Sequence, residues 1–84
     1  MSYSIDIDPR AQATIAALPA AALPALAEAI AVLELVPWSG RSVNPELNPD
    51  APVRNLPFGA AGMLTYLIVE RDQRVDVLLI TWSG

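Results

Sequence analysis

Eight prolines divide this 84-residue chain and leave room only for short helices. Pro9 follows Asp8, a residue type that caps helix N-termini well, and proline suits the first helical position because its missing N–H has no partner there. Pro24 is compatible only with the first turn of a helix. The prolines therefore predict two short helices, over 9–18 and about 21–35, which together form a helical hairpin.

Four further prolines lie between residues 37 and 52, three of them after Asn or Ala. This spacing predicts a segment without regular structure. It is longer than most connections, and such loops commonly carry function or are poorly ordered. Trp38 lies in this loop, either as a binding aromatic or as an anchor that pins the loop to the core.

Four segments have the composition of strands: residues 3–7, 53–58, 63–70 and 75–82. The last two are apolar on both faces, as expected of central strands. One face of the third carries Leu64, Tyr66 and Ile68, and one face of the fourth carries Val75, Val77 and Leu79. The order strand, helix, helix and three strands predicts a single α+β domain over residues 1–84, with the helical hairpin packed on an antiparallel sheet.

The chain is apolar and acidic, which limits the classes of function open to it. It is 54% hydrophobic, and its nine Asp and Glu residues outnumber five arginines, giving a net charge of −4. Nucleic-acid binders usually carry a basic surface, so only a local arginine cluster remains open here. We find no signal-like N-terminus and no apolar run of about 18 residues, and we expect a cytoplasmic protein without membrane contact.

The residue types needed for metal and thiol chemistry are scarce. Cysteine and histidine are absent, which excludes a disulfide framework, a thiolate zinc site and the commonest general base. Glu70, Asp72 and Asp76 lie close in sequence, but their spacing fixes no rigid set of ligands. We therefore expect neither a metal nor a cofactor.

Several short segments, in this order, resemble the RelE/ParE superfamily of toxins. They are YSIDIDPRA at 3–11, the Leu-Pro step at 18–19, VRNL at 53–56, and a strand with Tyr66 that leads into the hairpin at 70–74. The segments 37–59 and 75–82 resemble a branch of small actinobacterial-type proteins grouped with these toxins. The resemblance implies the toxin of a type II toxin–antitoxin pair, held inactive by a cognate antitoxin. In such families the RelE branch cuts mRNA on the ribosome, and the ParE branch inhibits DNA gyrase.

The resemblance also implies catalytic candidates. Metal-free RNA cleavage needs a base, cations for the developing phosphorane and an acid for the leaving oxygen. Arg54 matches a basic position of the family and is a candidate for catalysis and for nucleic-acid binding, while Tyr66 is a candidate proton donor. The alternative for Arg54 is an ion pair with Asp50 or Glu70. The alternative for Tyr66 is a core side chain with a bonded hydroxyl.

Two more residues are candidates for nucleic-acid contact. Arg41 in the loop could reach a substrate or an antitoxin, or be a solvated arginine. Trp82 could stack on a base, or pack against the helical hairpin. The sequence departs from the RelE pattern at Met63, where the family has an arginine. It departs again near Trp82, where the family's basic residue and terminal tyrosine have no counterpart.

Three functions follow from the resemblance. The first is a metal-independent mRNA endonuclease, or mRNA interferase, which stops translation and growth and has the ribosome, mRNA and an antitoxin as partners. The second is a ParE-like inhibitor of DNA gyrase, which needs no catalytic residues. The third is a catalytically degenerate member of the family that acts as a protein-binding module. The apolar composition also leaves a homodimer open.

Overall fold

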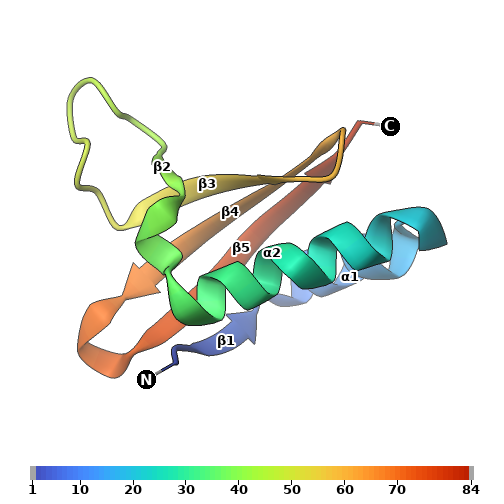
Figure 1. The fold of residues 1–84 in the computed structure, drawn as a ribbon, viewed down its shortest axis with the longest axis horizontal. Coiled ribbons are helices and arrows are strands. Elements are labelled where there is room, and N and C mark those ends of the chain that lie inside the picture. The colour runs from blue at the N-terminus through green and yellow to red at the C-terminus, as the bar shows by residue number, and fades with distance from the viewer. Residues whose placement is uncertain (1, 84) are drawn as a thin grey trace.

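The computed structural model describes residues 2–83, in which two helices cover one face of a five-stranded sheet (Figure 1). In chain order the elements are β1 (Ser4–Ile7), α1 (Pro9–Ala17), a 3-10 turn (Ala20–Ala22), α2 (Leu23–Leu35), a 3-10 turn (Pro37–Ser39), β2 (Arg41–Ser42), β3 (Val53–Phe58), β4 (Gly62–Val69), a 3-10 turn (Glu70–Asp72) and β5 (Arg74–Trp82). The α+β class and the helical hairpin are confirmed, and β2 is an additional strand.

The prolines and their neighbours set the helix boundaries as the sequence predicts. The Asp8 side chain accepts a hydrogen bond from the backbone N–H of Arg10 at 2.9 Å, which caps α1, and Pro9 takes the first helical position. Leu18 is extended, with φ −69° and ψ 146°, because the following proline disfavours the helical conformation. Pro24 lies in the first turn of α2.

The sheet is mixed, with the strand order β1-β5-β4-β3-β2. Strands β2 to β5 pair antiparallel, whereas β1 pairs with β5 in parallel, so the prediction of an antiparallel sheet is wrong at β1. The reason lies in the helical hairpin. It returns the chain to the end of the sheet where β1 began, so that β3 and β5 run in the direction of β1 (Figure 1).

The core lies between the sheet and the helices, and a β-bulge decides which part of β5 enters it. Leu64, Tyr66 and Ile68 of β4 are buried, as are Val75 and Val77 of β5. The predicted alternation then fails, because Leu79 is 48% exposed and Ile80 is 2% exposed. Thr65 pairs with Leu79 and Tyr66 with Val77, so Leu78 is an extra residue that reverses the alternation.

The outer edge of β3 is only partly paired. The two residues of β2 lie opposite Arg54 and Asn55, and the N–H of Val43 donates a hydrogen bond to the carbonyl oxygen of Val53 at 3.2 Å. Within residues 2–83, no strand pairs with residues 56–58 on that side. Pro57 lies in this unpaired stretch and has no N–H to offer to another strand. The prediction that the proline-rich loop excludes regular structure is wrong at β2, where the loop residues pair with β3 before they turn away.

Neither α-helix within residues 2–83 has the length and apolar content needed to cross a membrane by itself. The two helical segments meet that criterion only together, across a bend of 117°.

Candidate functional site

The loop between α2 and β3 wraps around the side chain of Arg54. Nε donates a hydrogen bond to the carbonyl oxygen of Ala51 at 3.1 Å, Nη1 to that of Gly40 at 2.8 Å, and Nη2 to that of Pro49 at 2.9 Å. The guanidinium carbon lies 4.7 Å from the centre of the Trp38 ring. Because Arg54 is only 8% exposed and each of its nitrogens donates within the protein, it holds both ends of the loop together.

The ion pair considered as an alternative for Arg54 does not form. Within residues 2–83 the ion pairs involve Arg71 and Arg74, with Asp72 and Asp76 as partners. Arg54 is bonded to backbone carbonyls instead, because the loop brings these oxygens to it from three sides.

Tyr66 is the cross-strand partner of Arg54 and fastens the same loop at its start. Its hydroxyl is buried and donates a hydrogen bond of 2.6 Å to the carbonyl oxygen of Pro37. Gly40 passes so close that a Cβ at this position would collide with the phenol oxygen. Burial raises the pKa of the Tyr66 phenol above its usual 10.0, against smaller effects of a backbone hydrogen bond from Gly40 and of the Arg54 charge. The phenol is therefore protonated at neutral pH.

Glu70, which follows β4, joins the loop to Tyr3, the residue before the strand at the other edge of the sheet. It accepts hydrogen bonds from the Tyr3 hydroxyl at 2.6 Å and from Nε1 of Trp38 at 2.9 Å. The hydrogen bond from Tyr3 and then that from Trp38 lower the pKa of the Glu70 carboxyl. The Trp38 ring also lies against Arg54, so Trp38 attaches the loop to Glu70 and Arg54. It is 39% exposed and lies outside the core cluster of residues 2–83, so the anchor to the core stays a prediction.

The structure separates the other two candidates from Arg54 and Tyr66. Arg41 is exposed and lies opposite Asn55 in β2, so alternation places it on the sheet face opposite to Arg54. Trp82 lies at the far end of β5, opposite Gly62, and stacks on Phe58 with ring centroids 5.7 Å apart. It packs against the core through Phe58, and its predicted packing against the helical hairpin stays a prediction.

Two acidic residues near the last hairpin, Asp72 and Asp76, are bonded to an arginine. Arg74 lies 3.2 Å from Asp72 and 2.8 Å from Asp76, between nitrogen and carboxylate oxygen in each case. Across residues 2–83, no group of three or more acidic side chains is arranged to hold a metal ion.

Two features of this site were missed by the sequence reasoning. Neither the backbone carbonyls that surround Arg54 nor the close approach of Gly40 to Tyr66 was expected. The alternation in β4 did indicate that Tyr66 is buried, because Tyr66 shares a face with Leu64 and Ile68. This face is buried in the structure.

A mixed five-stranded sheet with a helical hairpin on one face is the fold of RelE-type toxins. A chain in the crystal structure of the intact E. coli RelBE toxin–antitoxin complex matches with a TM-score of 0.75 and 17% identity, over 98% of this chain and 98% of that chain. A chain in the archaeal RelE–RelB complex from Pyrococcus horikoshii OT3 matches with a TM-score of 0.65 and 17% identity, over 100% of this chain and 98% of that chain. No family model and no curated protein matches the sequence.

Proposed function

We propose that this chain is the toxin of a type II toxin–antitoxin pair, and that it acts on its target by binding, without cleaving RNA. The first half of the proposal is supported by the fold, which it shares with chains of two toxin–antitoxin complexes over nearly its whole length. The second half is supported by one observation, the engagement of Arg54 and Tyr66 inside the protein.

Cleavage of RNA without a metal requires cations that face the phosphate and a proton donor beside the leaving oxygen. The guanidinium of Arg54 is directed at loop carbonyls, and the hydroxyl of Tyr66 is directed at Pro37. Arg41 lies on the other face of the sheet. The net charge of −4 adds a general repulsion of phosphates. Inhibition by protein contact, as expected for a gyrase inhibitor or a binding module, needs none of these groups.

A ribosome-dependent mRNA interferase is the second candidate. It is favoured by the likeness to a chain of the RelBE complex and by Arg41, which is exposed and free to meet a phosphate. In this case Arg41, rather than Arg54, is the cation to test first.

The test is expression of the chain alone in a bacterial host, followed by pulse labelling of protein and DNA synthesis and by primer extension on cellular mRNA. Growth arrest without new mRNA ends supports toxicity by binding, and co-expression of the product of the neighbouring reading frame should relieve it. New mRNA ends that disappear in Arg41→Ala, but persist in the matched exposed control Arg10→Ala, would establish the interferase. Growth at the normal rate would refute the toxin assignment.

A further inference from the structure

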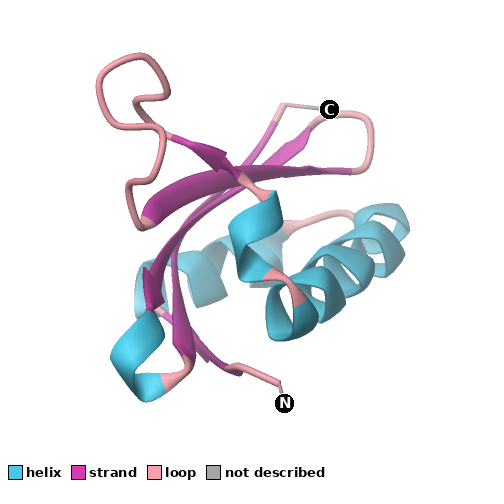
Figure 2. Ribbon diagram, turned by 60° about the vertical axis from the view of Figure 1, so that its left-hand side comes forward, coloured by secondary structure: helices cyan, strands magenta, loops and turns pink. Residues whose placement is uncertain are grey.

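Within residues 2–83, no helix or strand layer covers one face of the sheet. Both helices lie on the core side, and the opposite face is bare across β1, β5, β4 and β3 (Figure 2). The register gives the residues that share this face. Two of its rows are Asp6, Asp76, Leu67 and Val53, and Leu79, Thr65, Asn55 and Arg41. The row before them holds Arg74, between Ser4 and Val69, and Arg74 pairs with Asp76. Only one of the eight side chains in the two rows named first carries a positive charge.

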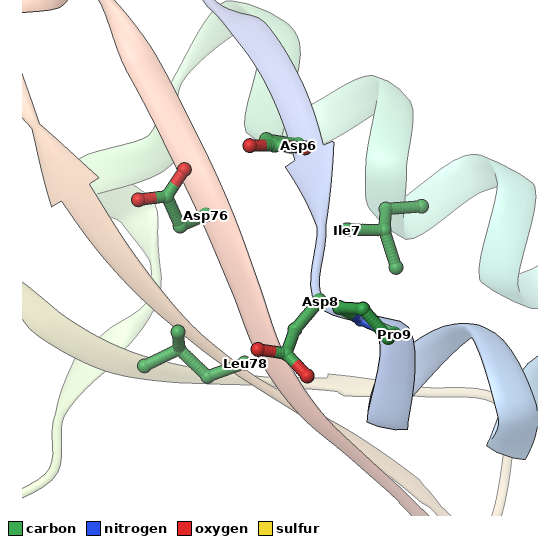
Figure 3. A pocket seen from close by; sticks show the side chains of 6 residues that line it. All are labelled: Asp6, Ile7, Asp8, Pro9, Asp76 and Leu78. Carbon is green, nitrogen blue, oxygen red and sulfur yellow. The ribbon is translucent and has the colours of Figure 1, made fainter.

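The end of this face at β1 is acidic and hollow. A pocket of about 230 Å³ is lined by Asp6, Asp8 and Asp76, together with Leu78 (Figure 3). Arg74 neutralises Asp76, and one oxygen of Asp8 caps α1. Asp6 takes part in none of the ion pairs within residues 2–83. The pocket therefore keeps a net negative charge of about two.

The middle of the face is apolar because of the β-bulge. The extra residue, Leu78, leaves two consecutive leucines turned away from the core, 37% and 48% exposed. Met63, on the neighbouring strand, is 36% exposed. Apolar side chains gathered beside a charged pocket on an uncovered sheet face are typical of an interaction surface.

We propose that this face binds an amphipathic helix of a partner chain, with the apolar stripe of the helix on Leu78 and Leu79 and its arginine or lysine side chains over Asp6 and Asp8. A helix is the element that covers a sheet face in a two-layer structure, as α1 and α2 do on the other side. Complementary charge requires that the partner be basic here. A second copy of the chain would bring the same acidic pocket against this one. The identification of the partner as an antitoxin rests on the proposed function, but the docking face does not.

The direct test is a titration of the full chain with a fluorescein-labelled amphipathic helical peptide of about 20 residues, enough to follow β5 along its length. One peptide carries a leucine stripe flanked by arginines, and a second carries glutamate in place of arginine. We expect the arginine peptide alone to bind. The double variant Asp6→Asn with Asp8→Asn should weaken binding about five- to tenfold. Asparagine is also a good N-cap, so the start of α1 is retained.

The matched control is Glu46→Gln with Asp50→Asn, two exposed acids of the loop, which changes the net charge by the same amount. We expect less than about a twofold effect from this pair, because exposed charges at a distance are screened by salt. Equal weakening by the two double variants would overturn the proposal, as would equal binding of the glutamate peptide. If the aspartate variants fail to fold, the apolar contact of the helix can be tested instead. Leu79→Ser should then weaken binding of the arginine peptide more than Leu47→Ser, the exposed control in the loop.

Sedimentation and growth distinguish the remaining explanations. A dimer that must dissociate before the peptide binds would assign the face to a second copy of the chain and overturn the proposal. A chain that binds the arginine peptide through Asp6 and Asp8, but does not arrest growth, would refute the toxin assignment and leave the docking face standing. A chain that arrests growth, but fails the peptide comparison, would refute the docking face and leave the toxin assignment standing.

Discussion

Replacement of Arg54 by alanine tests whether this arginine is a structural residue. The substitution removes four hydrogen bonds. One is a long bond of 3.5 Å to the Trp38 carbonyl, which contributes little; of the three shorter bonds, one goes to a buried carbonyl and two go to partly buried ones. A buried carbonyl left without a donor costs about 1–3 kcal/mol, and the two others, which water can reach, cost about 0.5 kcal/mol each. With the lost contact to Trp38 the expected decrease in the free energy of unfolding is about 3 kcal/mol.

Urea unfolding followed by far-UV circular dichroism measures this decrease as a lower midpoint with an unchanged slope. Arg54→Lys should fall between wild type and alanine, because an ammonium group cannot reach three carbonyls from one position. Arg10→Ala, an exposed arginine on α1, is the control and should change stability by less than about 0.5 kcal/mol. An Arg54→Ala protein as stable as this control would refute the structural role. Loss of growth arrest in that stable variant would then assign Arg54 to catalysis.

Three further substitutions test the rest of the loop attachment. Tyr66→Phe should lower stability by about 1–2 kcal/mol in the same urea assay, because it leaves a buried carbonyl without its donor. Gly40→Ala should lower it by about 3 kcal/mol through collision with the phenol oxygen, and less so in the Tyr66→Phe background; equal losses in the two backgrounds would contradict this contact. The folded-state pKa of Glu70 is lowered, first by the hydrogen bond from Tyr3. The ionised carboxylate therefore stabilises the fold at pH values above its usual pKa near 4.5, and this stabilisation is lost as the pH falls through the folded-state pKa. Glu70→Gln should therefore show a smaller loss of stability than wild type as the pH falls from about 6 to about 3. Parallel curves would refute this linkage.

The sequence predicted the elements well where local rules decide them. The cap at Asp8, the prolines in the first turns and the apolar strands act over a few residues, and these elements appear at the expected places. The failures come from interactions between distant segments. Nothing near residues 4–7 specifies a parallel partner, and nothing in the spacing of β5 reveals that Leu78 is an extra residue.

The candidate site shows the same division. The sequence singled out Arg54 and Tyr66, and the structure brings them together as a cross-strand pair. It gave no means of seeing that loop carbonyls would surround the arginine, because a carbonyl exists at every residue and only the path of the loop decides which ones converge. The family resemblance therefore pointed to Arg54, and the sequence left its role open.

The parallel pairing of β1 with β5 has a consequence for the kinetics of folding. Ser4 pairs with Arg74 and Ile7 with Val77, so this contact closes a loop of about 70 residues. Within residues 2–83, β5 is the only neighbour of the first strand in the sheet, so the first strand can pair only after β5 is in place. We expect folding in milliseconds to seconds rather than microseconds, with helices that form early and remain loosely packed until β5 arrives. During that interval the apolar faces of α1 and α2 are open to a chaperone or to a partner that binds the nascent chain.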